Sequence, residues 1–340
     1  MTGVVSYGFY IPKYRLKTSD VALVWGKDAD IVSGSLAVAE KAVSGSDEDS
    51  LTMAYESASM ALSDIKLNRK EIGAVFVGSE SHPYAVNPTS TILAEFLGIR
   101  GDYLASDTEF ACKAATGAII AGLSLIKSGY TNYCLVAAAD KAQAHPHDAL
   151  EYTAASGSAT FLLGNSDVLL EAIDYTSYST DTPDFWRREG IRYPSHGGRF
   201  TGKPSYFHHI LSASKKLLEK TKYSPGDFAH AVFHMPNGKF PVAVAAQLGF
   251  EKKQIEQSLV IKTLGNSYTA SALMGLVSVL DTAKPDDLIF FASFGSGAGS
   301  DAFIFKVTKE IKKHRRNLAE NMKDKKYIDY TTYLKYMNMI

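Results

Sequence analysis

The residue whose setting best suits covalent catalysis is Cys112, in the segment DTEFACKAATGAIIAGL. It follows an extended SDTEF stretch and opens a long run of small and apolar residues, 111–127, that predicts a buried helix. A thiol at a helix N-terminus feels the positive end of the helix dipole, so we expect a lowered pKa and a reactive thiolate. The other cysteine, Cys134, lies inside an apolar strand segment and is predicted to be an inert core residue.

A nucleophilic thiol needs a proton acceptor or hydrogen-bonding partner, and two residues at predicted strand ends suit that role. His234, in VFHMPNGKF, ends an apolar strand just before a Pro-Asn-Gly turn. Glu80, in VGSESHPYAVNP, ends another strand, and in an apolar cleft its pKa would rise to suit proton transfer. Taken alone, His234 reads equally well as a structural histidine, and Glu80 as a surface loop acid.

Two further segments could handle a carbonyl or an anion. Asn266, in TLGNSYTASALMG, precedes a second buried helix and holds nearly the position in the second half that Cys112 holds in the first. Its amide could polarise a carbonyl or simply cap the helix. The loop FGSGAGS at 294–300 could present backbone N–H groups to an anion, but it fits neither nucleotide-binding glycine pattern. The HPHD segment at 145–148 is too short-spaced to predict a metal site.

The elements that must position these residues occur twice along the chain. Four segments of the first half match four of the second in the same order and at nearly constant offset: IGAVFVGSE with AHAVFHMPN, AEFLGI with AAQLGF, GLSLIKSG with GLVSVLDT, and YCLVAAAD with LIFFASFG. Each half alternates strands and helices, which predicts an α/β body with largely parallel strands. We expect two sheets packed around shared central helices with pseudo-two-fold symmetry, and ligands at the carboxyl ends of strands.

The predicted organisation is an N-terminal half over residues 1–165, a C-terminal half over 166–308, and a tail over 309–340. The N-terminal half carries the candidate nucleophile. The tail is rich in Lys, Arg and Tyr. Charge runs are usually solvated, so we expect a terminal helix and arm in water, with docking of a partner protein as the alternative.

Composition narrows the function classes. The chain has 340 residues, 46% of them hydrophobic, with 36 basic and 36 acidic side chains. A balanced charge gives no reason to expect a nucleic-acid partner and weakly favours an oligomer. Two cysteines form no disulfide framework, and no signal peptide or membrane-spanning run is evident, so we expect a cytoplasmic protein.

The motifs together resemble a known family, the archaeal-type 3-hydroxy-3-methylglutaryl-CoA (HMG-CoA) synthases. The resemblance runs in order over essentially the whole chain, through YIPKYRLK, ESHPYAV, EFACKAATGA, FHMPNGKFP, LGNSYTAS, FGSGAGSDAF and YIDYTTYLKY. It implies the thiolase fold, a layered αβαβα body, and a homodimer. It also implies condensation of acetyl-CoA with acetoacetyl-CoA in the mevalonate route to isoprenoids, with CoA thioesters as substrates and no metal or other cofactor.

The resemblance also implies roles for individual residues. Cys112 would carry the acetyl group, Glu80 would deprotonate its methyl group, and His234 would bind and protonate the acetoacetyl carbonyl oxygen. The residues implied to contact substrate or CoA are Asp28, Ala29, Thr153, Thr201, Lys239, Asn266 and Ser296. One departure concerns CoA binding, because Ala243 stands where the family often has a basic residue.

Other readings remain open at this point. A ketoacyl-acyl-carrier-protein synthase III-like enzyme would also use Cys, His and Asn, but its decarboxylating reaction needs no carboxylate such as Glu80. A thiolase usually has a second catalytic cysteine near the FGSGAGS loop, and this chain has none after Cys134. A non-catalytic scaffold of an acyl-CoA complex would not need Cys112, Glu80 and His234 together. The family's association with a thiolase and a zinc-ribbon scaffold protein suggests those partners.

Overall fold

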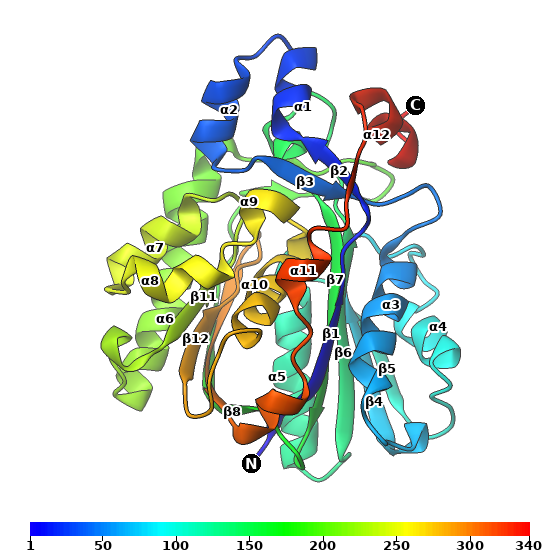
Figure 1. The fold of residues 1–340 in the computed structure, drawn as a ribbon, viewed down its shortest axis with the longest axis vertical. Helices are drawn as coiled ribbons and strands as arrows, with labels where there is room; N and C mark the ends of the chain where they lie inside the picture. Colours follow the sequence, from blue (N-terminus) through cyan, green and yellow to red (C-terminus); the bar gives the residue numbers. More distant parts are fainter.

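A nine-stranded mixed sheet forms the framework of the computed structural model, which describes residues 1–340 (Figure 1). Its strand order is β11-β12-β13-β8-β1-β7-β6-β4-β5. The strands are β1 (Gly3–Tyr10), β4 (Ile72–Gly78), β5 (Leu104–Thr108), β6 (Tyr133–Lys141), β7 (Ser156–Gly164), β8 (Leu170–Ser179), β11 (His230–Phe233), β12 (Leu288–Ala292) and β13 (Gly299–Val307).

The sheet repeats one arrangement on either side of its middle. Reading outward from the centre, β1-β7-β6-β4 corresponds to β8-β13-β12-β11, and only β5 has no counterpart. The internal repeat is therefore confirmed. The two expected sheets are joined edge to edge into one, but the β1–β8 junction pairs only Gly3 with Glu171 and Val4 with Leu170.

The expectation of largely parallel strands is wrong. Only the β4–β5, β4–β6 and β11–β12 pairs are parallel, and the other five neighbouring pairs are antiparallel. The reason lies in the connections. A helix links the parallel strands, whereas β6 to β7 and β12 to β13 are joined without a crossover helix, and such neighbours pair antiparallel.

Two apolar helices occupy the centre of the molecule, α5 (Ala114–Lys127) and α10 (Ser271–Leu280) (Figure 1). Every residue of α10 is buried, as its uniformly apolar and small composition requires. The first helix packs very close to the sheet at Gly78, where a Cβ atom would lie 2.4 Å from the backbone nitrogen of Ala115. A side chain there would push the N-terminus of α5 away from the strand that leads to Glu80.

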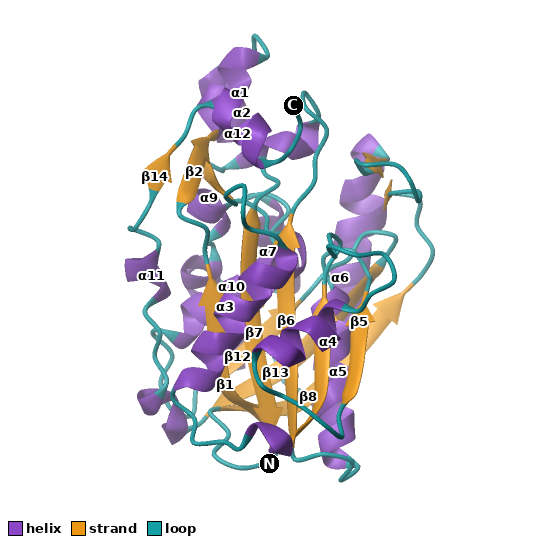
Figure 2. Ribbon diagram, turned by 90° about the vertical axis from the view of Figure 1, so that its right-hand side faces the viewer, coloured by secondary structure: helices purple, strands orange, loops and turns teal.

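Further helices cover the outer faces of the sheet, which completes the expected layered αβαβα body (Figure 2). On one half, α3 (Ser50–Ser63) packs on β1, β6 and β7, and α4 (Thr89–Phe96) packs on β4 and β5. On the other half, α6 (His208–Thr221) packs on β8 and β13, and α7 (Phe240–Leu248) packs on β11. Local signals set their ends, since Asp49 and Thr52 form a capping box at α3, and Asp107 of β5 accepts from the first amides of α4.

A small subdomain sits at one end of the molecule and includes the last part of the C-terminal tail, whereas the first part of the tail runs along the main body (Figure 1). Its three-stranded sheet has the order β14-β2-β3. Its elements are β2 (Tyr14–Lys17), α1 (Thr18–Val24), α2 (Ala29–Leu36), β3 (Glu40–Val43), β14 (Lys326–Tyr327) and α12 (Tyr330–Tyr336). None of the helices in the structure has the length and apolar character needed to cross a membrane.

The expectation that the tail over 309–340 is a solvated arm is wrong. Strand β14 adds to the edge of β2, and the Tyr333 ring is buried under the Nζ of Lys41, 4.2 Å from the ring centroid. Lys325 and Tyr327 both donate to the buried carboxylate of Glu40. The tyrosines of the tail cover apolar surface of the small subdomain. Burial of these aromatic side chains, and not the charge of the tail, therefore decides where the tail lies.

One buried ion pair links the two halves beside the candidate nucleophile. The Nζ of Lys113 lies 3.1 Å from Oδ2 of Asp301 on β13, with both side chains almost fully buried. Asp301 also accepts hydrogen bonds from Thr116 and Ser177 at 2.7 Å each. Removing one partner of such a pair leaves an uncompensated buried charge.

We therefore expect Asp301→Ala to lower the free energy of unfolding by about 3–5 kcal/mol, because Lys113 would be left buried without its counter-charge. Glu95→Ala is the matched control. It breaks the exposed 2.6 Å pair with Arg100 and should cost less than about 1 kcal/mol. Urea unfolding measures both, and equal losses in the two variants would contradict the prediction.

Candidate active site

Cys112 stands on a sharp backbone turn two residues before α5. The preceding residue, Ala111, has a φ of +43°, an unusual value for a residue with a side chain. The turn packs against the glycine-rich loop so closely that a Cβ on Gly295 would lie 2.3 Å from the carbonyl oxygen of Phe110. Cys112 itself is 9% exposed. The predicted position of this thiol at the entrance to a buried helix is confirmed.

The second half repeats this turn, with Tyr268 in the position of Ala111 and a φ of +46°. Both residues stand three positions before their buried helix, so Thr269 is the counterpart of Cys112. Asn266, expected to hold nearly the position of Cys112, lies three residues before the true counterpart, because the buried helix of the second half begins only at Ser271. The two turns touch, since the hydroxyl of Thr269 donates to the carbonyl of Ala111 at 3.2 Å.

A fully buried carboxylate, Asp140 at the end of β6, holds the loops around the nucleophile. It accepts from the hydroxyls of Ser79 and Ser81 at 2.8 and 2.7 Å, from the amide of Glu80 at 2.8 Å, and from the amide of Thr269 at 3.0 Å. Burial raises the pKa of Asp140, and these four donors oppose the rise by favouring the ionised form. The carboxylate thus joins the Glu80 loop to the turn of the second half.

Glu80 and Cys112 interact directly, and their surroundings shift both groups toward the protonated form. Burial raises the pKa of Glu80 to about 8, the charge of Asp140 adds to the rise, and contact with Cys112 and the charge of Arg187 oppose it. Burial also raises the pKa of the Cys112 thiol well above its usual value, and the charge of Glu80 adds to this rise. One carboxylate oxygen of Glu80 is buried without a hydrogen-bond partner.

The expected lowering of the Cys112 pKa is therefore wrong. The helix dipole acts on the thiol, but burial and the adjacent carboxylate act in the opposite sense and are larger. The resting Cys112 side chain is therefore a thiol, which would have to lose its proton to act as a nucleophile. Glu80, with a pKa near neutrality, is suited to exchange protons in this site.

His234 directly follows β11, as predicted, and is only 1% exposed. Its backbone is fixed because its amide donates to Ala292 at 2.9 Å and its carbonyl accepts from the hydroxyl of Tyr206 at 2.7 Å. Nδ1 is buried without a partner, so Nε2 is the ring nitrogen that meets the cavity described below. Burial lowers the pKa of His234 to about 3, which keeps the imidazole neutral at physiological pH.

Asn266 and Ser296 complete the polar groups at the nucleophile. The side-chain oxygen of Asn266 accepts from the amide of Tyr268 at 3.0 Å, which leaves its NH₂ group as a free donor. The glycine-rich loop is not the open anion cradle that its composition suggested, because the amides of Gly295, Gly297 and Ala298 donate to other parts of the chain. The amide of Ser296 has no acceptor in the chain and remains available.

A largely apolar cavity of about 390 Å³ brings most of these residues together. Cys112, His234, Asn266 and Ser296 line it, and so do Thr153 and Thr201. Its other lining residues include Leu36, Leu150, Phe185, Tyr206, Phe240 and Phe294. The cavity extends from Cys112 to Leu36 at the end of α2 and Phe240 at the start of α7. We refer to it as the tunnel.

Three predicted binding residues do not line the tunnel. Asp28 is exposed and caps the N-terminus of α2, whereas Leu36, at the opposite end of that helix, reaches the tunnel wall. Ala29 packs in the small subdomain. Lys239 is exposed at the start of α7, between the lining residues Asn237 and Phe240.

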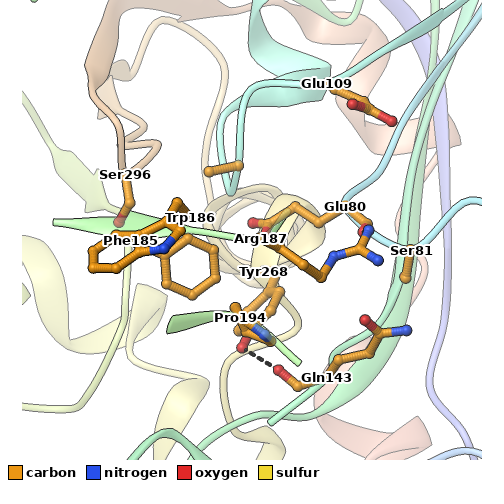
Figure 3. Close-up of a pocket in the computed structure, with 11 residues that line it drawn as sticks. Glu80, Ser81, Glu109, Gln143, Phe185, Trp186, Arg187, Pro194, Tyr268 and Ser296 are labelled. Atoms are coloured by element: carbon orange, nitrogen blue, oxygen red, sulfur yellow. Dashed lines mark hydrogen bonds between the residues drawn. The ribbon is translucent and has the colours of Figure 1, made fainter. Parts of the chain in front are cut away.

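A second, polar cavity of about 210 Å³ reaches the same centre from another direction (Figure 3). Glu80, Ala111, Gln143, Arg187 and Tyr268 are among its lining residues. Figure 3 shows the Glu80 carboxylate, the Tyr268 ring and the aromatic pair Phe185 and Trp186 around this cavity. Phe185, Tyr268 and Ser296 line both cavities and so form the wall between them.

This geometry supports acyl chemistry on sulfur. A thiol is available to accept an acyl group, and a carboxylate of raised pKa lies against it. Two neutral N–H donors, from His234 and Asn266, face the tunnel and could polarise a carbonyl oxygen there. The structure contains no group of three or more His, Cys, Asp or Glu side chains arranged to hold a metal ion.

Sequence reasoning missed several residues of the site. Asp140 ends the strand segment YCLVAAAD, so the signal that identified Glu80, a carboxylate at a strand end, was also present for Asp140. Phe185 and Trp186 form β9, a two-residue strand paired with β10 (Ser195–His196), and such a short strand leaves no periodic signal. Arg187 follows directly and was missed for the same reason.

Comparison with known proteins identifies the family. The chain is 52% identical to the hydroxymethylglutaryl-CoA synthase of Archaeoglobus fulgidus, over 100% of this chain and 99% of the relative. It is 50% identical to the Methanopyrus kandleri enzyme of that name, over 98% and 96% of the two chains. Residues 218–307 match the model of the C-terminal part of 3-oxoacyl-[acyl-carrier-protein] synthase III.

Solved structures support the fold assignment. An HMG-CoA synthase complexed with CoA superimposes with a TM-score of 0.89 and 23% identity, over 98% of this chain and 89% of that chain. MvaS in complex with 3-hydroxy-3-methylglutaryl coenzyme A superimposes with a TM-score of 0.90 and 22% identity, over 99% and 91%. The expected thiolase-like fold is confirmed. With half of its residues identical to those of full-length relatives, the chain belongs to the hydroxymethylglutaryl-CoA synthase family.

Proposed function

We propose that Cys112, Glu80 and His234 together carry the condensation of acetyl-CoA with acetoacetyl-CoA and water to HMG-CoA and CoA. The observation that carries this assignment is a buried carboxylate of raised pKa placed close enough to a buried thiol for the two to shift each other's pKa, with the thiol lining the tunnel. Members of this family act on CoA thioesters, and an apolar tunnel of this kind suits a pantetheine arm. That no metal or further cofactor takes part remains a prediction.

In the first step, the sulfur of Cys112 attacks the acetyl thioester and CoA leaves with a proton. The amide of Ser296, free of internal acceptors, is positioned to stabilise the carbonyl oxygen as it becomes negative. Transfer of the acetyl group to Cys112 divides a difficult reaction into three easier steps, which are acyl transfer, condensation and hydrolysis.

In the second step, Glu80 removes a proton from the acetyl methyl group, and the resulting enolate attacks the ketone of acetoacetyl-CoA. His234 and Asn266 donate hydrogen bonds to the ketone oxygen as it gains charge. Because His234 is neutral, it acts as a hydrogen-bond donor and not as a standing cation. We assign the proton that finally reaches this oxygen to the acid form of Glu80. It passes to the oxygen directly or by way of His234.

The other residues proposed to bind substrate differ in their position relative to the tunnel. Thr153 and Thr201 line the tunnel and are suited to meet the pantetheine arm. Lys239 is exposed beside that lining, where an ammonium group can meet a CoA phosphate. Asp28 and Ala29 would need to contact CoA outside the tunnel, and Ala243 is exposed on α7 without a charge to offer.

The ketoacyl synthase alternative finds less support. The match to the synthase III model spans residues 218–307 only, whereas the identity to HMG-CoA synthases runs over the full chain. The position of Glu80 against Cys112 also suits proton removal from carbon, which a decarboxylating condensation does not need. Burying Glu80 beside Cys112 is electrostatically unfavourable, and a purely structural role does not explain why the two are placed together.

The acylation step is tested by incubating the protein with acetyl-CoA and measuring its intact mass after acid quench. We expect one acetyl group on the wild type and on Cys134→Ala, and none on Cys112→Ala, because Cys134 is buried in a strand away from both cavities. An adduct that persists in Cys112→Ala would overturn the assignment of the nucleophile.

The pH dependence follows from the Glu80 pKa of about 8. Only the ionised form accepts a proton, so solvent exchange of the acetyl methyl protons should rise about tenfold per pH unit below pH 8 and level off above it. No second change is expected near pH 6.5, since His234 stays neutral there. Glu80→Gln should slow exchange by roughly 10²–10⁴-fold. A flat profile from pH 6 to 9 would exclude Glu80 as the base.

We also propose a homodimer that forms through the free edge of β5. This strand pairs only with β4 and leaves its outer backbone groups open to another chain. Exposed apolar side chains lie on it and in the loop before α4, at Leu104, Tyr84 and Val86. The opposite sheet edge, β11, is largely buried.

Leu104→Lys combined with Val86→Glu should weaken this dimer by at least about tenfold in dissociation constant, because charges would be desolvated at the interface. Leu23→Lys, at an exposed apolar residue on α1, serves as control and should not change the mass. Light scattering after gel filtration measures both. A monomeric wild type, or a dimer indifferent to the double substitution, would refute the proposal.

The larger organisation also remains a proposal. The repeated order of elements supports two related units over 1–165 and 166–308, followed by the tail over 309–340. Because the tail is packed on the small subdomain, a thiolase or zinc-ribbon scaffold partner would have to meet its outer face and not a free arm. The two unpaired cysteines agree with a reducing compartment such as the cytoplasm.

A further inference from the structure

Water must reach the thioester on Cys112 to release the condensation product, and the tunnel alone does not provide a path for it. This inference rests on the function proposed above. After the carbon–carbon bond forms, the product is held at both ends, by a thioester to Cys112 and by its own CoA arm. The arm occupies the tunnel until the Cys112 thioester is hydrolysed. Water for that hydrolysis must therefore reach the sulfur while the tunnel is filled.

The polar cavity offers the other approach. Its inner wall includes Ala111, which directly precedes Cys112, and Glu80, whose charge acts on the Cys112 thiol, whereas the Cys112 side chain itself lines the tunnel. Its rim includes the exposed side chains of Glu109, Trp186 and Arg187. It thus runs from solvent to the centre. Its volume of about 210 Å³ leaves room for several water molecules, since each takes about 30 Å³ in the liquid.

The wall between the cavities separates their contents. Phe185 and Tyr268 line both sides, with their rings edge to face at a centroid distance of 6.2 Å. Tyr268 is fixed because its hydroxyl donates to the carbonyl of Gln143 at 2.8 Å (Figure 3). An acyl-CoA arm in the tunnel therefore does not fill the polar cavity.

The cavity also carries a guanidinium, that of Arg187, which forms no close ion pair although Glu80 and Glu109 line the same cavity. Arg187 makes no ion pair within 4.0 Å, and its Nη2 donates only to the backbone carbonyl of Glu80 at 3.1 Å. Hydrolysis creates a carboxylate beside Glu80, where two anions would repel one another. A guanidinium at this rim favours that product and holds the second charge.

We propose that the polar cavity is the compartment for hydrolysis, which delivers water to the acylated Cys112 and receives the nascent product carboxylate, with Arg187 as its cation. Water adds to the thioester carbon as Glu80 takes one of its protons. The carbon–sulfur bond then breaks, and that proton passes from Glu80 to the sulfur. The other proton of the water is released when the product acid ionises, so Glu80 and Cys112 return to their starting states.

The test separates condensation from hydrolysis in a single turnover. Pre-acetylated enzyme is mixed with acetoacetyl-CoA, quenched in acid at intervals, and its intact mass is measured alongside released HMG-CoA. Arg187→Met removes the charge, and Gln143→Trp fills the cavity while keeping the backbone carbonyl that holds Tyr268. Arg188→Met is the matched control, because this neighbouring exposed arginine lines neither cavity.

In both cavity variants we expect hydrolysis to be slowed roughly 10- to 100-fold, because Arg187→Met removes a hydrogen bond to a charged group and Gln143→Trp displaces the water. The enzyme should then accumulate as the Cys112 adduct that carries the condensed CoA product. Arg187→Lys should recover part of the loss, and Arg188→Met should behave as wild type.

The outcomes separate this inference from the function on which it rests. Release of HMG-CoA at the wild-type rate by both cavity variants would overturn the hydrolysis compartment and leave the function intact. Accumulation of acetyl-enzyme instead of the condensed adduct would also overturn it, because the defect would then lie before hydrolysis. Failure of the wild type to form any acetyl adduct would refute the proposed function itself.

Discussion

A single buried carboxylate organises this site. Asp140 accepts four hydrogen bonds, three from residues 79–81 and one from Thr269 at the start of the second half's central turn. A buried charge is tolerated only with such compensation, so the donors have little freedom to move. Glu80, whose amide is one of them, is thereby held where its side chain meets Cys112. The two halves of the duplicated fold thus meet at one hydrogen-bonded point beside the reacting atoms.

The duplication explains how one scaffold supplies unlike groups to one centre. Both halves turn through the same unusual backbone conformation before a buried helix, at Ala111 and at Tyr268. In the first half the next residue is the proposed nucleophile, and in the second it is Thr269, whose amide donates to Asp140 and whose hydroxyl donates to the carbonyl of Ala111. On this assignment the turn of the first half supplies the reacting group, and the turn of the second half supports it by hydrogen bonds. The buried ion pair between Lys113 and Asp301 adds a second connection across the same boundary.

Most of the fold, and the positions of the three candidate catalytic residues in it, could be predicted from the sequence because they depend on local patterns. Strand ends identified Glu80 and His234, and the small-residue helix identified Cys112. The thiol's pKa was misjudged because the helix dipole is local, whereas the opposing carboxylate comes from a distant stretch of chain. The position of the tail could not be predicted for a similar reason. Its charge is a local property of the sequence, whereas its pairing with β2 joins distant stretches of chain. Arg187 follows a strand too short for any periodicity to reveal.

The protonated state of Cys112 has a consequence for the enzyme at rest. Oxidants and alkylating agents attack thiolates far faster than thiols, so a cysteine kept protonated by burial is shielded from peroxide and stray electrophiles. Many catalytic cysteines achieve reactivity through a low pKa and accept oxidative damage as the result. In the proposed mechanism the sulfur becomes a strong nucleophile only when Glu80 takes its proton as the thioester arrives. The same desolvation that slows ionisation therefore preserves the enzyme between turnovers.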